Sequence, residues 1–408
     1  MKCRHCQAAV TLPFIDLQTS PPSNSYVSRA ELGAPEKWYP LRVFVCTQCW
    51  LVQTEDFAHF SELFSNDYAY FSSFSTSWLK HAEHYVAEME KRLELGPASR
   101  VIEVASNDGY LLQYVRQRGI PCLGIEPTAS TADAARDKGI EVVEEFFGVA
   151  LADNLVSQGR SADLTAANNV LAHVPDINDF VAGFARVLKP HGVSTFEFPH
   201  LVRMVEHCQF DTIYHEHFSY LSLTAVDTIF SRNGLHVFDV QELPTHGGSL
   251  RVFAQRADTG VRPRTPALES LLQREISLGV ASSAYYTGFQ QRADRIKDDL
   301  VSFLIDWKRQ GKRIGAYGAA AKGNTLLNYA GVRSDLLPWV VDRNPAKQGR
   351  FLPGCRIPIV DEARLKQERP DAVLILPWNL RAEVVDQLAY ARDWGAKFVC
   401  AVPQLAID

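Results

Sequence analysis

The chain has 408 residues, of which 46% are hydrophobic and 22% are charged, and its formal net charge is -5 at pH 7. This length is sufficient for two to three packed domains. No cluster of lysine and arginine is present, which argues against a nucleic-acid binder. No apolar run is long enough to span a membrane, and the segment Met1–Cys6 lacks the apolar core of a signal peptide. We therefore expect a cytoplasmic monomer that binds neither membrane nor nucleic acid.

Two short cysteine pairs, Cys3/Cys6 and Cys46/Cys49, account for four of the eight cysteines. In a reducing compartment, two CxxC pairs favour a metal over a disulfide, and four thiolates suit a closed, structural zinc site. The alternatives are redox-active or unpaired cysteines. His5 is a possible substitute ligand, although we expect it to be exposed. The region between the pairs includes residues 21–26, a candidate substrate-facing loop.

An aromatic, hydroxyl-rich stretch covers residues 66–75 and either lines a pocket or packs between domains. Apolar residues then recur at helical spacing from Trp78 to Leu93, and Gly96-Pro97 ends the predicted helix.

The central feature is the segment from Val101 to Arg118, which reads as a strand, a tight polar turn and a helix. The next strand ends in Glu126, where nucleotide-binding α/β sheets place a carboxylate for ribose hydroxyls. Ala105 and Asn107 replace the glycines of a dinucleotide fingerprint, which leaves less room for a pyrophosphate. The segment therefore favours S-adenosylmethionine, with a nicotinamide cofactor or a ligand-free turn as the alternatives.

Strands and helices alternate as far as a fifth strand, Val193 to Phe198, and residues 189–192 are predicted to separate that strand from the preceding helix. Ligands bind beyond the carboxyl ends of strands in such sheets. Phe146, in an expected adenine-edge loop, and Asn169 and His173, after the fourth strand, are therefore candidates for the site.

The densest group of titratable side chains lies in residues 211–220 and includes Tyr214, His215, Glu216 and His217. A sharp turn would let Glu216 orient one imidazole as a base. The spacing does not fit the HExxH metal motif. The group is either a catalytic pocket or a buried polar network.

Two glycine-containing turns follow. The first, Thr245 to Arg251, either holds a polar ligand or is a solvated hairpin turn. A long helix is then predicted to run to Gln310. The second turn, residues 318–324, opens another α/β unit, where Lys322 at a helix start could bind a diphosphate, or where small residues simply allow close packing.

Taken together, the paired CxxC motifs, the Ser106–Gly109 turn, the Asn169–His173 stretch, the Tyr214–His217 cluster and the turns at 246–251 and 318–324 resemble one family. That family is the C-methyltransferases of nucleotide-linked 4-keto deoxysugars, and the likeness covers nearly the whole chain. The resemblance implies an α/β protein of three domains: a zinc-binding domain (1–70), a Rossmann-like methyltransferase domain (71–265) and a C-terminal Rossmann-like domain (266–408) that helps to hold the nucleotide sugar.

The resemblance also implies the roles of individual residues. The catalytic set is His217, Glu216, Tyr214, His173 and Tyr68. The adenosylmethionine set is Glu103, Ala105, Ser106, Asn107, Gly109, Tyr110, Leu111, Glu126, Pro127, Phe146, Asn169 and His173. The substrate set is Tyr68, Phe198, His246, Ser249, Arg251, Tyr317, Gly318, Ala319, Lys322, Asn324, Asp342 and Asn379. Cys3, Cys6, Cys46 and Cys49 are the zinc ligands.

The expected reaction transfers a methyl group to a ring carbon, C3 in the first instance, of a dTDP-linked 4-keto sugar. His217 is the expected base and Glu216 orients it, although His173 or Tyr214 could serve instead. The alternatives are C5 methylation, an NAD-dependent sugar oxidoreductase, or a non-catalytic protein that binds nucleotide sugars.

Overall fold

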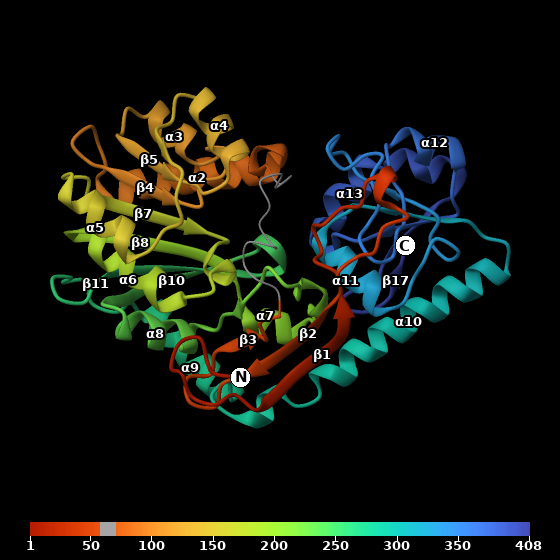
Figure 1. Ribbon diagram of the computed structural model, residues 1–408, viewed down its shortest axis with the longest axis horizontal. Coiled ribbons are helices and arrows are strands. Elements are labelled where there is room, and N and C mark those ends of the chain that lie inside the picture. The colour runs from red at the N-terminus through yellow and green to blue at the C-terminus, as the bar shows by residue number, and fades with distance from the viewer. Residues whose placement is uncertain (58–70) are drawn as a thin grey trace.

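The computed structural model describes residues 1–57 and 71–408, and the strands of this part of the chain form three sheets (Figure 1). The seven-stranded sheet and the six-stranded sheet lie on opposite sides of the view, and the N-terminal strands lie beneath and between them. None of the helices in the described ranges combines the length and apolarity that a membrane crossing needs.

The N-terminal sheet is antiparallel, with the order β1-β2-β3-β9. Its strands are β1 (Leu12–Ser20), β2 (Tyr39–Val45), β3 (Val52–Thr54) and β9 (Ser219–Tyr220). Strand β9 comes from the middle of the sequence and directly follows the Tyr214–His217 cluster. The candidate catalytic segment is therefore anchored at the edge of the N-terminal sheet.

The middle sheet has the order β10-β11-β8-β7-β4-β5-β6. Five strands are parallel: β4 (Val101–Val104), β5 (Cys122–Ile125), β6 (Val142–Val143), β7 (Ala162–Asn168) and β8 (Leu188–Pro199). Strands β10 (Leu235–Leu243) and β11 (Ser249–Arg256) add an antiparallel edge. The ends of the parallel strands thus converge on one edge of the sheet, where ligands of open α/β folds bind.

Helices cover both faces of this sheet because its strands are apolar on both sides. Helices α2 (Thr76–Leu93), α3 (Leu112–Gln117) and α4 (Ala129–Asp137) share a core with Val101. Helices α5 (Val149–Ser157), α6 (Ile177–Val187), α8 (Leu223–Arg232) and α9 (Pro266–Leu278) share another with Ile102. The short α7 (Leu201–Glu206) follows β8 and contributes to a third core, which extends toward the C-terminal sheet.

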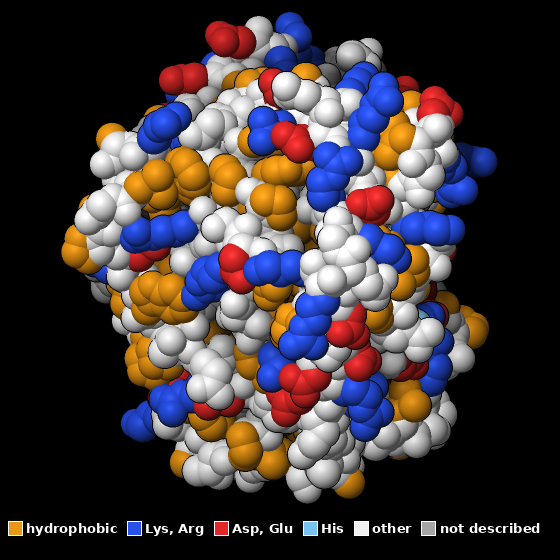
Figure 2. Space-filling view, turned by 90° about the vertical axis from the view of Figure 1, so that its right-hand side faces the viewer, with side chains coloured by type: hydrophobic (Ala, Val, Ile, Leu, Met, Phe, Trp, Pro, Cys, Tyr) orange, Lys and Arg blue, Asp and Glu red, His pale blue; other side chains and the backbone are white. Residues whose placement is uncertain are grey.

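The C-terminal sheet has the order β14-β13-β12-β15-β16-β17. Its parallel strands are β12 (Ile314–Tyr317), β13 (Val340–Val341), β14 (Ile359–Val360), β15 (Ala372–Ile375) and β16 (Lys397–Cys400), and β17 (Ala406–Ile407) is antiparallel. Its helices are α11 (Ala321–Tyr329), α12 (Ala363–Glu368) and α13 (Arg381–Gln387). Lysine and arginine side chains on the face shown in Figure 2 are interspersed with acidic and apolar side chains, so this face carries no continuous basic surface.

The long helix predicted up to Gln310 is interrupted in the structure. Gly279 ends α9 with a φ of 80°, and Gly288 precedes α10 (Phe289–Arg309) with a φ of 86°. Both are left-handed conformations that glycine adopts at little cost. Helix α10 then runs along the lower edge of the view from the N-terminal sheet to the C-terminal domain (Figure 1), and Phe289 stacks on Phe14 of β1 with ring centroids 4.3 Å apart.

One predicted boundary is wrong. Residues 189–192 were expected to separate a helix from a strand, but they lie inside β8, which begins immediately after α6 ends at Val187. The early pairing of Leu188 with Ala162 of β7 draws this proline- and glycine-containing stretch into the strand.

Candidate active site and metal centre

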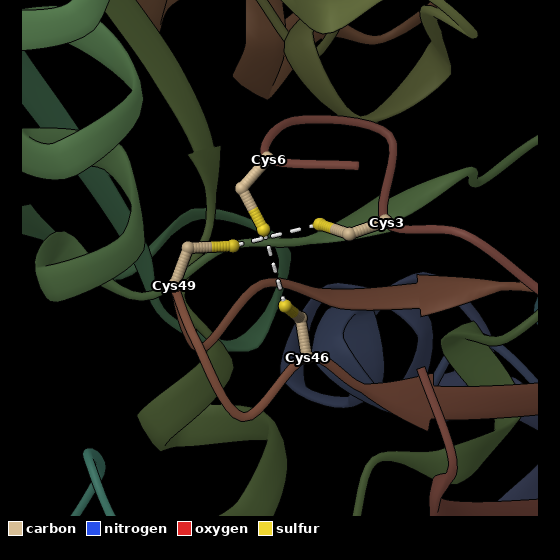
Figure 3. Close-up of side chains that lie close together, drawn as sticks. All are labelled: Cys3, Cys6, Cys46 and Cys49. Carbon is tan, nitrogen blue, oxygen red and sulfur yellow. Dashed lines mark hydrogen bonds between the residues drawn. The ribbon is translucent and has the colours of Figure 1, made fainter. Parts of the chain in front are cut away.

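The four N-terminal cysteines lie in two facing turns (Figure 3). Their sulfur atoms all lie within 4.8 Å of one another, with 3.5 Å between Cys3 and Cys49 and 3.5 Å between Cys6 and Cys46. Four sulfurs about 2.3 Å from a tetrahedral zinc would lie about 3.8 Å apart. The donor set therefore fits one zinc ion with every position taken by protein, which makes the site structural.

His5 is not part of this cluster. Its side chain is 6% exposed, and Nδ1 lies 2.7 Å from Oδ1 of Asn178 in α6. The expectation that His5 is exposed is wrong, because its imidazole ties the metal-binding turn to the middle domain.

The cofactor turn after β4 has an unusual backbone. Ala105, Asn107 and Gly109 all have positive φ values, of 58°, 50° and 74°. The turn thus adopts a glycine-like path with glycine at only one of these three positions. Glu126, at the end of β5, accepts hydrogen bonds from the backbone N–H of Asn107 (2.9 Å) and of Thr128 (3.0 Å). Burial raises the pKa of Glu126.

Polar atoms around this turn fit a bound adenosylmethionine. Within the described chain, Ser106 Oγ, Asn168 Oδ1 and Asn169 Oδ1 are buried without a hydrogen-bond partner. Buried acceptors of this kind are costly unless a ligand supplies donors, and the amino group and ribose hydroxyls of adenosylmethionine are such donors. Glu103 is also fully buried, and burial raises its pKa well above the ordinary value.

The other predicted cofactor residues surround the same turn. Tyr110 and Leu111 are buried at the start of α3, and Pro127 follows Glu126. Phe146 follows β6 by three positions and is 61% exposed.

The segment preceding α2 covers the cofactor turn. The backbone N–H of Ser72 donates to Asn107 Oδ1 at 2.9 Å, and that of Ser73 lies 3.3 Å from Asp108 Oδ2. Lys138 Nζ donates to Ser73 Oγ at 2.8 Å. Tyr68, predicted for catalysis and substrate binding, lies outside the described residues.

Three aromatic side chains of the predicted catalytic set meet at one point. The ring of His217 lies 4.6 Å from that of His173 and 3.9 Å from that of Tyr214. His217 Nδ1 lies 2.8 Å from the carbonyl oxygen of Thr212, so Nδ1 carries the proton and donates it. The other ring nitrogen, Nε2, is then left as an acceptor, which is the state that a general base requires.

The histidines of this region are held neutral. Burial lowers the pKa of His173 to about 4 and that of His217 well below its ordinary value. The positive charge of Lys322 also contributes to the shift at His217.

Glu216 does not orient His217, contrary to the sequence interpretation, because the Thr212 carbonyl has that role. Glu216 is 1% exposed, and its Oε1 accepts from Asn24 Nδ2 at 3.1 Å. Burial raises its pKa to about 7. Asn24 belongs to the N-terminal loop after β1, which therefore reaches the catalytic segment.

His246 lies in the turn between β10 and β11 and contacts residues near the predicted cofactor site. Its Nε2 lies 3.1 Å from Asn169 Nδ2, and its ring lies 5.2 Å from that of Trp78. A Cβ on the neighbouring Gly247 would lie 2.4 Å from the ring of Trp378 in the C-terminal domain. Glycine at this position therefore permits close approach of another domain.

Three predicted substrate residues are buried among contacts within the protein. Arg251 is 2% exposed and pairs with Glu197 at 2.8 Å. Ser249 Oγ donates to the Thr245 carbonyl at 3.0 Å. Phe198 is fully buried in the core of the middle sheet. Strand alternation and a buried ion pair turn these side chains inward, and their role in substrate binding stays a prediction.

The network of hydrogen bonds and ion pairs around Arg251 was not predicted from the sequence. Glu197, on β8, also accepts from Thr245 Oγ1 at 2.9 Å and lies 2.8 Å from His81 Nε2. Glu197 is 54 positions from Arg251 in the sequence, and no local motif signals the pair.

The turn after β12 is occupied by contacts within the protein itself. The Ala319 N–H donates to Asp342 Oδ2 at 2.8 Å, while its carbonyl accepts from Tyr26 Oη (2.6 Å) and Lys347 Nζ (2.9 Å). Gly318 has a φ of 89°, and its Cβ would meet Pro377 at 2.4 Å. The small residues of this turn therefore allow close packing.

Two further substrate predictions in this domain are buried. Tyr317 is 6% exposed, with its hydroxyl 2.6 Å from Gln387 Nε2. Asn324 is fully buried on α11, where its Oδ1 accepts from Asn328 Nδ2 at 3.1 Å. Both side chains have contacts within the protein, and their role in substrate binding stays a prediction.

Lys322 and Asn379 face the middle domain. Lys322 Nζ donates to Asn379 Oδ1 at 2.7 Å and lies 4.4 Å from the ring centre of Trp378. Trp378 Nε1 in turn donates to Asp211 Oδ2 at 2.7 Å. Asp211 immediately precedes Thr212, so this contact connects the C-terminal domain to the residue that orients His217.

The fold and the site define an S-adenosylmethionine-dependent methyltransferase with a zinc-binding N-terminal domain. Three family descriptions match successive parts of the chain: a "zinc binding domain" over residues 3–64, a "Methyltransferase domain" over 78–240 and a "C-methyltransferase C-terminal domain" over 244–403. The chain belongs to the C-methyltransferase family, and it is a C-methyltransferase that uses S-adenosylmethionine and zinc.

A curated relative, C-methyltransferase NovU from Streptomyces niveus, is 32% identical over 405 residues, which are 99% of this chain and 96% of that protein. A ubiquinone biosynthesis O-methyltransferase from Hahella chejuensis (strain KCTC 2396) is 29% identical over 96 residues, or 23% of this chain and 40% of that protein. Among solved structures, magnesium protoporphyrin IX methyltransferase (ChlM) from Synechocystis PCC 6803 with bound SAM matches 44% of this chain and 79% of that chain at 15% identity, with a TM-score of 0.34.

Proposed function

We propose that the protein methylates a ring carbon, C3 in the first instance, of a nucleotide-linked 4-keto deoxysugar, with dTDP as the expected nucleotide. The observation that carries this proposal is the fixed, neutral imidazole of His217 beside His173 and Tyr214. C-methylation needs a carbon nucleophile, and a proton next to a ketone is acidic enough to be removed when the resulting enolate is stabilised.

The proposed first step is proton removal. The C–H bond next to the C4 ketone breaks and its proton moves to Nε2 of His217. The electron pair of that bond forms a C=C bond, and the carbonyl π pair moves to the C4 oxygen. Thr212 supports this step because its carbonyl holds the Nδ1 proton and fixes the direction of Nε2.

In the second step, the C=C pair of the enolate would form the bond to the methyl carbon while the bond between that carbon and the donor's sulfur breaks. The electron pair of the broken bond would stay on sulfur, S-adenosylhomocysteine would leave, and the C4 carbonyl would be restored. Bound adenosylmethionine supplies that methyl group as an electrophile. We propose that Glu126 and the Ser106–Gly109 turn hold the donor, and that Tyr214 and His173 bind the substrate oxygen. Proximity of the two reactants then lowers the barrier, which requires both ligands to bind beside the His217 cluster.

The reaction can be tested with a dTDP-linked 4-keto deoxysugar in deuterated water. We expect deuterium to enter the adjacent carbon even without adenosylmethionine, and a methyl group to appear there when the donor is added. NMR of the methyl-bearing carbon distinguishes C3 from C5. Absence of both exchange and methylation would overturn the proposed function.

The role of His217 is tested by His217→Ala, which should remove the exchange. His207→Ala is a matched control because His207 caps α7 outside the cluster, and it should exchange like the wild type. Normal exchange by His217→Ala would place the base elsewhere, at His173 or Tyr214.

The main alternative, an NAD-dependent oxidoreductase, is less well supported. The C-terminal turn that would receive a pyrophosphate already bonds to Tyr26, Lys347 and Asp342 of the protein itself. Quenching of NADH fluorescence on titration, without consumption of adenosylmethionine, would favour that alternative.

A further inference from the structure

We propose that Lys322 is a catalytic residue that stabilises the enolate oxygen, rather than a ligand of the substrate diphosphate. This inference rests on the proposed function and concerns the same group of residues. It assigns the C-terminal domain a part in the chemistry as well as in nucleotide binding.

The position of the ammonium group is the first argument. Lys322 lies in the first turn of α11, and Asn379 holds its Nζ at 2.7 Å while the ring of Trp378 lies 4.4 Å away. These two residues follow β15, so the tip of a long, flexible side chain is fixed from the opposite side of the turn. Fixed cations aimed at developing charge are more effective than mobile ones, since they need no reorganisation.

The second argument is the direction in which the group faces. Trp378 bonds to Asp211, and Asp211 precedes Thr212, whose carbonyl orients His217. Trp378 also packs against Gly247, next to His246. Lys322 is thus placed opposite the imidazoles, and its charge contributes to the lowered pKa of both His217 and His246.

Hydrogen-bond capacity is the third argument. An ammonium group has three N–H donors, and within the described residues one hydrogen bond, to Asn379, uses them. Two donors are left for an oxygen atom of the substrate. A ketone oxygen that becomes an enolate gains most from such donors as its charge develops.

Charge balance argues against a diphosphate at this point. The carboxylate of Asp211 is fully buried and electrostatically coupled to Lys322. A diphosphate would bring at least two negative charges beside that carboxylate, whereas an enolate brings one charge, and only during the reaction. His217 becomes an imidazolium when it takes the proton, so the first step creates one positive charge on the side of the base; Lys322 adds a fixed positive charge at the enolate oxygen.

The test compares Lys322→Met with the wild type under the exchange assay described above. We expect Lys322→Met to lower the rate of deuterium incorporation by about 100-fold or more, the typical cost of losing one oxyanion donor. The KM for the sugar nucleotide and the affinity for free dTDP, measured by calorimetry, should stay within about twofold, since the nucleotide lies elsewhere.

Two further variants keep the test decisive. Lys322→Arg retains a cation and should recover part of the exchange rate. Asn379→Ala keeps the positive charge of Lys322 but removes the hydrogen bond that fixes its position. This variant should lower kcat while the KM is unchanged. Retained adenosylmethionine binding checks that each variant is folded.

The outcomes separate this inference from the proposed function. Normal exchange by Lys322→Met, or a loss confined to KM and dTDP affinity, would overturn the role of Lys322 and restore the diphosphate assignment. Failure of the wild type to exchange would instead overturn the proposed function.

Discussion

Glu216 provides a test in which stability and activity are expected to change in opposite directions. Its carboxyl group is 1% exposed, and burial raises its pKa from 4.5 to about 7. The folded protein therefore keeps a proton that the unfolded chain releases between these two values. Stability falls as the pH rises through this window, and above it the folded state carries the full cost of a buried carboxylate.

The size of this cost follows from the shift. A difference of 2.5 between the two pKa values corresponds to about 3 kcal/mol at high pH, at about 1.4 kcal/mol per unit. Glu216→Gln removes the ionisation but keeps an oxygen that can accept from Asn24. We expect the variant to be more stable than the wild type by about 3 kcal/mol near pH 8.5 and by about 1 kcal/mol near pH 5.5.

The assay is urea unfolding of both proteins, with zinc bound, at the two pH values, together with methyl transfer. A matched control is Glu275→Gln. Burial opposes ionisation of Glu275, but the His200 imidazole at 2.7 Å and the hydrogen bonds from Thr224 together outweigh it and lower the pKa, so this variant should lose stability. A stability difference for Glu216→Gln that does not change with pH would refute the reasoning, as would a variant that is both more stable and fully active.

Three other predictions concern the metal, a domain contact and an ion pair. Chelation, or Cys46→Ala, should remove about one zinc per chain by elemental analysis and lower the melting temperature, whereas Cys122→Ala should retain the metal. Gly247→Ala should lower the free energy of unfolding by about 1–3 kcal/mol and reduce kcat, because the φ of Gly247 is 89° and a Cβ there would clash with Trp378. The control is Gly311→Ala, which also has a positive φ but no atom within 4 Å of the added Cβ. This control should lose less stability and leave kcat unchanged. Arg251→Met should cost about 3–5 kcal/mol in unfolding, since it removes the guanidinium from a buried carboxylate that then keeps only His81 and Thr245. A changed KM with normal stability would instead support a substrate contact.

Local patterns predicted much of the fold. The strand, turn and helix around Ser106 follow from apolar periodicity and from a polar turn, and two CxxC pairs predicted a sulfur cluster that the structure assembles. These features depend on residues close together in the sequence. Prediction at that range needs only the geometry of helices, strands and metal ligands.

The rest depends on contacts between distant segments. The residue that holds His217 contributes a backbone carbonyl, which no side-chain motif reveals. The sequence alone suggests that Arg251 binds a ligand, because its partner Glu197 lies on another strand and is not evident from neighbouring residues. Phe198 lies at the end of a strand, yet its alternation places it in the core. Such features become visible only when the strand order is known.

The N-terminal loop after β1 also has a practical meaning for protein engineering. Through Asn24 it touches the catalytic segment, through Tyr26 the C-terminal turn, and through Ser23 the hydroxyl of Thr325 on α11. A chimera that exchanges the last third of the chain between two such enzymes, to alter the sugar accepted, would leave this loop matched to the wrong partner. Exchange of the loop and the C-terminal third as one unit should preserve turnover in designed hybrids.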